Sequence, residues 1–334
     1  MRIGVLGINH KSSELCLREI VAKVAEQCFG KKSLWGCWLK GVLLSTCNRT
    51  EIYFCGDKLP ELHSQILSVL RGAILEPFEH GLYSYFGEDC FSHLAQVTSG
   101  LDSAVTFETE IQRQVKVAYE NACQDHSLAS ELHFLFQKCL KMGKTVRTLF
   151  PSSRSSIGLE QTIFQVAQTF FRNLDDIAIL FVGNSEINRK ILSYFNRKSK
   201  PKIILGTRHV KHAEKCEENI SICDLDQLKS CLDYELVICG SYFHDYFIRR
   251  EELQKKSSFR LKLILDLAVP RNVDPHIKYD PHVQLLNIDD LSKFLDQKRA
   301  CYEQEIQSCL KKIREDAEKQ IMLFEQKTLQ PVAQ

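Results

Sequence analysis

Apolar and polar positions alternate near the N-terminus in a way that predicts a small α+β domain. An apolar run at 3–8 predicts a strand, and an amphipathic pattern at 14–28 predicts a helix after it. A second apolar run at 41–46 and an alternating run at 51–55 predict two further strands. The polar stretch Cys47-Asn48-Arg49-Thr50 separates these two runs. Cys47 is therefore expected where a strand ends, a place usually occupied by a buried structural cysteine.

Helical spacing dominates the next part of the chain. The last predicted helix ends before Pro151, and the segment 151–156 has the composition of a turn or linker. We therefore predict a first domain over 1–150. Its predicted helices span 59–75, 88–99, 107–125 and 128–149.

From 151 to 288 the pattern alternates between strands and helices. This alternation predicts a parallel sheet flanked by helices, a Rossmann-like nucleotide-binding domain. The turn at 183–188 falls where a dinucleotide fingerprint would lie, but Gly183 is the only glycine in it, and one glycine after a strand more often marks a tight turn. The predicted helices are 159–173, 186–197 and 209–218, and the predicted strands are 177–182, 202–205, 235–239 and 261–267.

The C-terminal region, 289–334, carries apolar residues at spacings of three, four or seven. This pattern predicts one continuous helix over 289–328, roughly 60 Å long at about 1.5 Å per residue. A helix of that length has to pack along other domains or another chain, or be a core-facing amphipathic helix.

Composition supports an ordinary globular protein. The 334 residues are 44% hydrophobic and 26% charged, enough for two or three cores and too apolar for a largely disordered chain. The first apolar stretch is too short for a signal peptide, and no run approaches the roughly 20 apolar residues that span a bilayer. We predict a cytoplasmic protein without membrane segments. The 14 cysteines contain no C-x-x-C pair, so we expect neither a disulfide framework nor a metal site.

Net charge gives no signal for nucleic acid, because 44 basic residues face 42 acidic ones. Two basic clusters do occur, one in the segment 197–202 and one at helical spacing. Solvated surface is their more common explanation, with an RNA-binding face as the alternative. The helical cluster comprises Lys138, Lys141, Lys144 and Arg147, with Arg154 beyond it.

Five motifs carry a resemblance to one family. GINHKSS at 7–13, LSTCNRTEIY at 44–53, SHLAQVTSGLDS at 92–103, DLAVPRNVDP at 266–275 and IDDL at 288–291 resemble glutamyl-tRNA reductases in content and order. The resemblance implies an α/β multidomain protein with an N-terminal α+β catalytic domain, a Rossmann-like NADP-binding domain and a long C-terminal spinal helix. It also implies NADPH-dependent reduction of glutamyl-tRNA(Glu) to glutamate 1-semialdehyde, the first step of tetrapyrrole (porphyrin, haem) synthesis.

The resemblance assigns Cys47 as the nucleophile. Its thiolate would attack the ester that joins glutamate to the tRNA, forming a thioester and releasing the tRNA. Arg49 is close enough in sequence to contribute positive potential. His93 matches a position with a general-acid role and would protonate the departing ribose oxygen.

The resemblance also implies substrate-binding residues, at Thr46, Cys47, Asn48, Arg49, Ser103, Glu108, Thr109, Glu110 and Gln114. An arginine fork suits the carboxylate of a glutamyl side chain. Phe107-Glu108-Thr109-Glu110 departs from the family's usual Gly-Glu-Pro-Gln, and Glu110 adds a negative charge that has to turn away from a glutamate pocket.

The implied cofactor residues are Gly183, Asn184, Ser185, Glu186, Ile187, Asn188, Thr207 and Arg208. The family usually has Gly-Ala-Gly-Glu-Met-Gly at this turn, so two glycines are replaced here. Side-chain hydrogen bonds from Ser185 and Asn188, together with a helix N-terminus, would have to hold the pyrophosphate. Arg208 is placed to meet the 2′-phosphate of NADPH.

Two other functions stay open at this point. A catalytically silent tRNA-binding or regulatory homologue would fit the altered turn, and a dehydrogenase of a free metabolite would need neither Cys47 nor tRNA. The chain ends at Gln334, without the family's usual dimerisation domain, so homodimerisation also stays open. The aminomutase that consumes glutamate 1-semialdehyde is an expected partner, because a reactive aldehyde favours direct handover.

Overall fold

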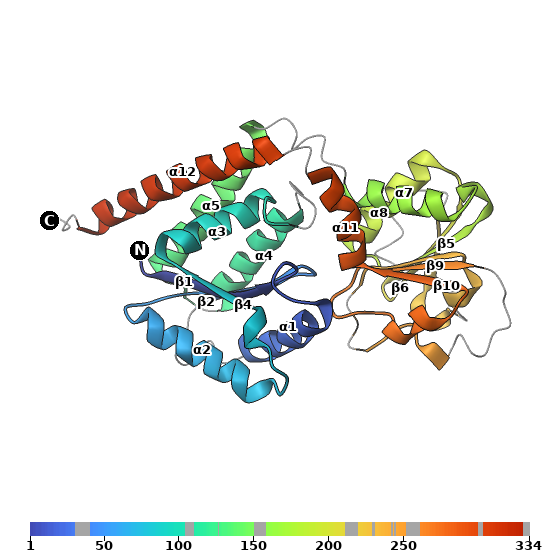
Figure 1. The fold of residues 1–334 in the computed structure, drawn as a ribbon, viewed down its shortest axis with the longest axis horizontal. Helices are drawn as coiled ribbons and strands as arrows, with labels where there is room; N and C mark the ends of the chain where they lie inside the picture. Colours follow the sequence, from blue (N-terminus) through green and yellow to red (C-terminus); the bar gives the residue numbers. More distant parts are fainter. Residues whose placement is uncertain are drawn as a thin grey trace. The chain divides into compact units, whose positions relative to one another are not determined.

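The computed structural model describes residues 1–30, 41–103, 110–125, 127–149, 158–210, 220–228, 231–241, 243, 245–251, 261–299 and 303–329. The chain divides into two compact units (Figure 1), which are described separately below. The first unit comprises 1–156 and 296–334, and the second comprises 157–295. Within the described ranges, no helix is both long enough and apolar enough to cross a membrane.

The first unit is built on a four-stranded antiparallel sheet. Its strands lie in the order β2-β3-β1-β4, so β1 sits between β3 and β4. The register pairs Ser45 with Thr50 and Arg49 with Asn9, so β3 begins at Arg49 rather than at the predicted residue 51. The strands are β1 (Ile3–Asn9), β2 (Gly41–Ser45), β3 (Arg49–Cys55) and β4 (Leu82–Phe86).

Helices cover both faces of this sheet (Figure 1). Ile52 and Phe54 face a core formed with α1 and α2, whereas Tyr53 faces a core formed with α3, α4 and α5. Because successive side chains of a strand point to opposite faces, Arg49 and Glu51 share the face of Tyr53. The helices are α1 (Leu15–Phe29), α2 (Leu59–Ala73), α3 (Gly87–Ser99), α4 (Glu110–Asp125) and α5 (Ser130–Leu149).

The C-terminal helix α12 (Glu303–Leu329) packs against α3 and α5 of the same unit. Its buried residues recur every three or four positions, as an amphipathic helix on a core requires; they are Ile306, Cys309, Ile313 and Ala317. The structure describes α11 (Ile288–Arg299) as a separate helix. Residues 300–302 lie outside the described residues, so the continuity of the predicted 289–328 helix is not described there.

The second unit holds a six-stranded parallel sheet in the order β10-β9-β8-β5-β6-β7. This is the doubly wound order of a Rossmann fold, and it confirms the predicted class. The chain reverses its direction of winding between β5 and β8, the place where such folds bind nucleotides. The strands are β5 (Ala178–Val182), β6 (Lys202–Thr207), β7 (Ile220–Asp224), β8 (Leu236–Cys239), β9 (Lys262–Asp266) and β10 (Val283–Asn287).

Two α-helices of the second unit, α7 (Leu159–Phe170) and α8 (Glu186–Lys198), pack against each other. The helix predicted over 209–218 lies outside the described residues, apart from its first two positions. Short 3₁₀ helices occur at Glu79–Gly81 in the first unit and at Leu174–Asp176, Leu225–Gln227, Cys231–Asp233 and Pro275–Tyr279 in the second.

Three strands were not predicted from the sequence: β4, β7 and β10. Each lies at an edge of its sheet. An edge strand has one neighbour and more solvent, so it lacks the continuous apolar run of a central parallel strand. In β7 and β10 only the first residue is buried, whereas β8 and β9 are buried throughout.

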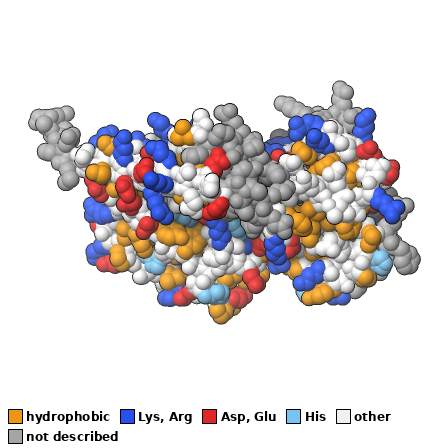
Figure 2. Space-filling model, turned by 45° about the horizontal axis from the view of Figure 1, so that its top comes forward, with side chains coloured by type: hydrophobic (Ala, Val, Ile, Leu, Met, Phe, Trp, Pro, Cys, Tyr) orange, Lys and Arg blue, Asp and Glu red, His pale blue; other side chains and the backbone are white. Residues whose placement is uncertain are grey.

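The surface agrees with the near-neutral net charge. On the face drawn in Figure 2, Lys and Arg side chains are interspersed with Asp and Glu rather than gathered in one patch. Within the helical basic cluster, Arg147 donates to the carbonyl of Thr98 at 3.0 Å and to the side chain of Gln112. Arg147 is thus part of the packing between helices.

Candidate active site

Cys47 lies in the turn that joins β2 to β3. The N–H of Thr46 donates to the carbonyl of Arg49 at 2.8 Å, and the hydroxyl of Thr46 accepts the N–H groups of Asn48 and Arg49 at 3.3 and 3.2 Å. A further bond runs from the N–H of His10 to the carbonyl of Asn48 at 3.0 Å. The turn therefore holds a partly exposed thiol at a defined place on the sheet. Cys47 is therefore not a cysteine buried in the core, the kind that most often occupies the end of a strand.

Glu51 is the centre of a buried network on the α3 side of the sheet. Its Oε1 accepts from Arg49 at 2.9 Å, from the hydroxyl of Tyr83 at 2.6 Å and from Nε2 of His93 at 2.8 Å. Its Oε2 accepts from the hydroxyl of Tyr53 at 2.6 Å. Residues from β3, β4 and α3 are thus fixed by one carboxylate.

The charges in this network determine which side chains donate hydrogen bonds and which accept them. Burial alone would raise the pKa of the Glu51 carboxyl, but interactions with His93 and Arg49 hold that pKa well below its usual range. Burial and the charge of Glu51 raise the pKa values of Tyr53 and Tyr83, so both phenols keep their protons. Because the carboxylate can only accept, Nε2 of His93 carries a proton and donates it to Glu51.

His93 is also held by aromatic rings. The rings of Tyr83 and Tyr85 lie 5.4 and 4.9 Å from the His93 ring, centroid to centroid. With Nε2 bonded to Glu51, the imidazole is fixed in orientation as well as in tautomer. Only Nδ1 of His93 is left for chemistry with a substrate.

The turn after α3 brings a second carboxylate to Arg49. Gly100 takes a left-handed conformation (φ +77°) and ends the helix, and the chain then turns back toward β3. Asp102 accepts a 2.9 Å bond from Arg49 through Oδ2, and its carbonyl accepts a second bond from the same guanidinium. Lys11 pairs with Oδ1 of Asp102. The result is a continuous chain of alternating charges, Lys11–Asp102–Arg49–Glu51, to which His93 is hydrogen-bonded.

Burial and charge set the protonation of the outer members of this chain. Burial by itself would raise the pKa of the Asp102 carboxyl, but the positive charges of Arg49 and Lys11 lower it to about 2. Burial first, and then the neighbouring charges of Arg49 and Lys11, lower the pKa of His10 to about 4. At neutral pH Asp102 is ionised and His10 is neutral.

Four buried polar atoms around the Cys47 turn have no hydrogen-bond partner among the described residues. Buried polar atoms are nearly always bonded, so a group of them marks the place where water or a polar ligand binds. The segments that carry them adjoin one another through the His10–Asn48 and Arg49–Asp102 bonds. The four atoms are Nδ1 of His10, Oδ1 of Asn48, Nε of Arg49 and Oγ of Ser103.

The remaining predicted substrate residues are not among the unpartnered polar groups around the Cys47 turn. Glu108 and Thr109 lie outside the described residues. Glu110 begins α4 and accepts from Nε of Arg113 at 3.0 Å, so its negative charge is paired on its own helix. Gln114 is half-buried on the next turn of α4.

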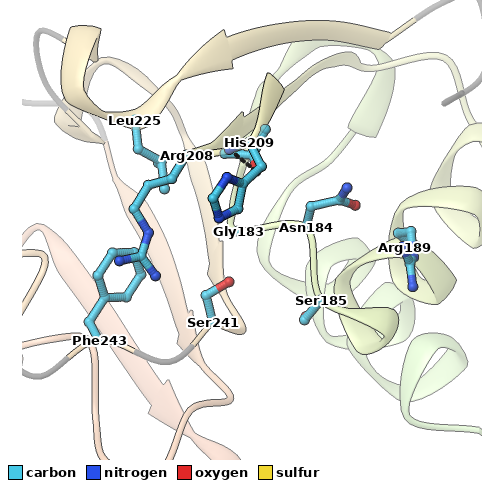
Figure 3. Close-up of a pocket in the computed structure, with 10 residues that line it drawn as sticks. Gly183, Asn184, Ser185, Arg189, Arg208, His209, Leu225, Ser241 and Phe243 are labelled. Carbon is cyan, nitrogen blue, oxygen red and sulfur yellow. Dashed lines mark hydrogen bonds between the residues drawn. The ribbon is translucent and has the colours of Figure 1, made fainter. Parts of the chain in front are cut away.

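The second unit contains a cavity of about 620 Å³ at the carboxyl ends of β5, β6 and β8 (Figure 3). It lies at the switch point of the sheet, where a nucleotide would bind. Five of the predicted cofactor residues line it: Gly183, Asn184, Ser185, Thr207 and Arg208. The other lining residues are Arg189, His209, Leu225, Ser241 and Phe243.

Gly183 is required by the geometry of the turn. Its φ of +92° disfavours any residue with a Cβ, and an added Cβ would lie 1.4 Å from Oγ of Ser241. Ser185 then caps α8 by accepting the N–H of Asn188 at 3.2 Å. Ser185 and Arg189 line the cavity at this end of α8, and a helix N-terminus favours a phosphate.

Asn188 shows how the turn accommodates its missing third glycine. Its Nδ2 donates to the carbonyls of Val182 and Gly183 at 2.9 and 2.8 Å, so the side chain folds under the turn. Space for it comes from Gly240, where an added Cβ would lie 2.4 Å from Oδ1 of Asn188. Glu186, Ile187 and Asn188 do not line the cavity, and the replaced glycine leaves it unobstructed.

Arg208 and Phe243 form one wall of the cavity (Figure 3). The guanidinium carbon lies 5.0 Å from the centre of the phenyl ring, within cation–π range. Arg189 lies beyond Ser185 in the same view, on the other side of the Gly183–Ser185 turn. Cationic side chains on both sides of a helix N-terminus suit a dinucleotide that carries several phosphates.

Sequence reasoning missed Glu51, Asp102, Lys11 and Tyr83 as members of the site. The available signal was an Arg-x-Glu-x-Tyr alternation at 49–53, which puts two charges on one buried face of a strand. Buried charges on a strand require partners, but the sequence does not say that those partners come from α3, β4 and the β1 turn.

Comparisons with known proteins match both units. The N-terminal domain model of glutamyl-tRNA(Glu) reductase matches residues 6–149, and the shikimate/quinate 5-dehydrogenase model matches residues 165–294. The chain is similar to a glutamyl-tRNA reductase of Idiomarina loihiensis, with 29% identity over 89% of this chain and 72% of that protein. It is also similar to one of Chlamydia abortus, with 34% identity over 81% of this chain and 78% of that protein.

Among solved structures, the glutamyl-tRNA reductase of Methanopyrus kandleri is similar with a TM-score of 0.48 and 22% identity, covering 98% of this chain and 82% of that one. The sequence match to the Chlamydia abortus protein spans most of both chains. The N-terminal domain model covers the segment that carries Cys47 and His93. By these sequence matches, the chain belongs to the glutamyl-tRNA reductase family.

Proposed function

We propose that this chain reduces glutamyl-tRNA(Glu) to glutamate 1-semialdehyde with NADPH and releases the tRNA, the first step of tetrapyrrole synthesis. Family membership supports the reaction, and the fold supplies a Rossmann-type cofactor cavity. The observation that carries the chemical step is the Cys47 turn. A partly exposed thiol is fixed at the sheet end that also holds Arg49, Glu51 and the unpartnered polar atoms.

In the first step the sulfur of Cys47 attacks the ester carbonyl. A carbon–sulfur bond forms, the carbon–oxygen bond to the ribose breaks, and the ribose oxygen takes a proton. Since Nε2 of His93 is committed to Glu51, Nδ1 is the atom that would deliver this proton. The Glu51 carboxylate stabilises the protonated imidazole before transfer, as the acidic partner of a histidine does in hydrolytic triads.

The cavity of the second unit would hold NADPH. The Gly183–Ser185 turn and the N-terminus of α8 fit the pyrophosphate, and Thr207 with Arg208 fits the 2′-phosphate. When bound, NADPH supplies the hydride that reduces the Cys47 thioester to the aldehyde.

Substrate recognition follows from the same geometry. Oγ of Ser103 and Oδ1 of Asn48 are buried and have no hydrogen-bond partner among the described residues, so they can bond to the substrate. Arg49 provides a fixed positive charge beside the turn. We further propose a cytoplasmic location, where charged tRNA is found, and direct handover of the aldehyde to the aminomutase. Self-association is tested by light scattering at working concentration, where a monomer mass alone would exclude a homodimer.

Incubation of the purified chain with glutamyl-tRNA, with and without NADPH, tests the proposal. We compare wild type with Cys47→Ser and with Cys16→Ser, an exposed cysteine of α1 that serves as control. The expected result is NADPH-dependent aldehyde that disappears in Cys47→Ser and persists in Cys16→Ser. Cys47-dependent tRNA release without aldehyde would leave the reduction step unsupported, and the absence of release would favour a silent tRNA-binding protein.

A further inference from the structure

Tyr85 is an exposed aromatic ring that lies directly beside His93. The two ring centroids are 4.9 Å apart with the planes tilted by 33°, close to a stacked pair, and Tyr85 is 38% exposed. The other exposed aromatic among the described residues of the first unit is Phe86, which packs against Phe54 and His63 on the opposite face of the sheet. On the face of His93, Tyr85 is therefore the most exposed aromatic residue in the described ranges.

The position of Tyr85 is fixed by its strand. Tyr83 and Tyr85 are two residues apart on β4, so both side chains point to the α3 side of the sheet. Gly7 on β1 leaves room for the ring of Tyr83, from which an added Cβ would lie 2.9 Å away, and the Tyr83 hydroxyl reaches Glu51 across that strand. The rings of Tyr83 and Tyr85 lie 5.4 Å apart, centroid to centroid. Tyr85 thus packs against a ring that is itself held in place.

The hydroxyl end of Tyr85 is influenced by the carboxylates of the candidate active site. Burial first, and then the charges of Asp102 and Glu51, raise the pKa of the Tyr85 hydroxyl, so the phenol keeps its proton. Asp102 is bonded to Arg49, the residue at which β3 begins after the Cys47 turn. The exposed ring therefore borders the site that holds the nucleophile.

The leaving group of the proposed first step has a part that fits such a ring. That leaving group is the terminal adenosine of the tRNA, whose ribose oxygen has to lie at Nδ1 of His93 to receive a proton. The adenine is attached to the same ribose, so it has to lie near the His93 ring as well. Proteins commonly hold an unpaired base by stacking it on an aromatic side chain. Tyr85 is the exposed ring at the required place.

Resting on the proposed function, we propose that the ring of Tyr85 stacks on the terminal adenine of the tRNA and thereby places the ribose oxygen at Nδ1 of His93. The base lies on the other side of the ester bond from the glutamyl group, so this contact is separate from recognition of the amino acid. Tyr85 transfers no proton in this role. It binds the nucleoside that leaves, while the acyl group meets the Cys47 turn.

Two minimal esters test the proposal: 3′-O-glutamyl-adenosine, and the 3′-O-glutamyl ester of methyl β-riboside, which lacks the base. The second-order rate constant of Cys47-dependent release is measured for both esters in wild type, Tyr85→Ala, Tyr85→Phe and Phe86→Ala. Wild type should favour the adenosine ester roughly ten- to hundred-fold, the usual effect of one stacked base. Tyr85→Ala should lose this preference through a slower reaction of the adenosine ester alone, and Tyr85→Phe should keep it.

Phe86→Ala is the matched control, because it removes an exposed ring of the same strand from the opposite face. It should keep the preference of wild type. The ratio of the two rate constants within one protein cancels any loss of folded protein, so a destabilised variant cannot imitate the expected result. An adenosine preference that survives Tyr85→Ala, an equal loss on both esters, or no preference in wild type would overturn the proposal.

A binding measurement separates this proposal from the reaction itself. Uncharged tRNA(Glu) with 2-aminopurine in place of its terminal adenine reports stacking, because stacking on an aromatic ring quenches the fluorescence of this base. Fluorescence is read at saturating protein, with saturation followed by the anisotropy of a dye at the 5′ end. Quenching should occur with wild type and Tyr85→Phe and disappear with Tyr85→Ala.

The two experiments fail independently. If wild type makes no aldehyde yet quenches the terminal base in a Tyr85-dependent way, the proposed reaction fails and the base-binding role stands. If wild type makes aldehyde but does not quench the base, or quenches it equally after Tyr85→Ala, the reaction stands and the role of Tyr85 is refuted.

Discussion

Nε2 of His93 donates to Oε1 of Glu51 across 2.8 Å, joining α3 to β3 over 42 positions of sequence. Both side chains are buried, and the same carboxylate oxygen accepts from Arg49 and Tyr83. A buried carboxylate with this many donors fixes the parts of the site relative to one another. Its removal should therefore affect stability and catalysis together.

Glu51→Gln tests this coupling. The amide cannot balance the charge of Arg49 and brings its own N–H donors toward Arg49, His93 and Tyr83. We expect the free energy of unfolding in urea to fall by about 3–5 kcal/mol, the usual cost of breaking a buried ion pair. Cys47-dependent tRNA release should fall with it.

Tyr53→Phe is the matched control, because it removes only the hydroxyl bonded to Oε2 of Glu51. That change should cost about 1 kcal/mol and leave tRNA release nearly intact. If Glu51→Gln proved no more destabilising than Tyr53→Phe, the carboxylate would not be the centre of the network.

The lowered pKa of His10 predicts that the stability of the fold depends on pH. Its pKa is lowered from 6.5 to about 4 in the folded chain, first by burial and then by Arg49 and Lys11. Between these values the unfolded chain binds the proton and the folded chain does not, so stability is full above pH 6.5 and is lost as the pH falls toward 4. The slope should approach about 1.4 kcal/mol per pH unit for this one group.

Urea unfolding of wild type and His10→Asn across this range measures the effect. The variant should show a flatter profile between the two pH values. Selective ¹³C labelling of histidine gives an independent check, because the His10 signal should titrate near pH 4. A His10 signal that titrated near 6.5 would remove the basis of the prediction.

Gly183→Ala tests the cofactor turn. An added Cβ would lie 1.4 Å from Oγ of Ser241, and the φ of +92° is strained for alanine, so the turn has to open. We expect NADPH affinity, measured by fluorescence titration, to fall at least ten-fold. Gly72→Ala in α2 is the control, because apart from the adjoining backbone of α2 no atom of the described residues lies within 4 Å of its Cβ position. It should leave NADPH binding unchanged and stabilise the helix by up to about 1 kcal/mol.

Arg208→Leu tests cofactor selection. The guanidinium lies over the ring of Phe243 at the wall of the cavity, where a 2′-phosphate would add two charge-assisted bonds. The KM for NADPH should rise roughly ten- to hundred-fold while that for NADH stays constant. Arg197→Leu is the control, since Arg197 lies over Tyr194 at the far end of α8. A parallel rise for both cofactors would mean that Arg208 supports the fold of the wall.

Local pattern was enough to predict much of the architecture. The strands β1, β2, β5 and β8, the helices α1 to α5, and the turn that follows β5 were all predicted from spacing within short windows. Their signals are strong because a central strand carries a continuous run of apolar residues and an amphipathic helix carries apolar residues every three or four positions. The edge strands β4, β7 and β10 were not predicted because a partly solvated strand contains fewer apolar residues, and its apolar pattern is therefore weaker.

The sequence by itself determined the chemical groups of the site: Cys47 after a strand, His93 on a helix, and Gly183 at a βα turn. Tertiary structure decided what those groups do. The partners of Glu51 and Arg49 come from up to 53 positions away, and no local window contains both members of such a pair. The structure alone showed that Arg49 is bonded to two carboxylates, that Tyr85 lies exposed beside His93, and that Asn188 folds under its turn against Gly240. Burial and pairing of charges depend on distances through space, and distances are fixed only when the sheets and helices pack.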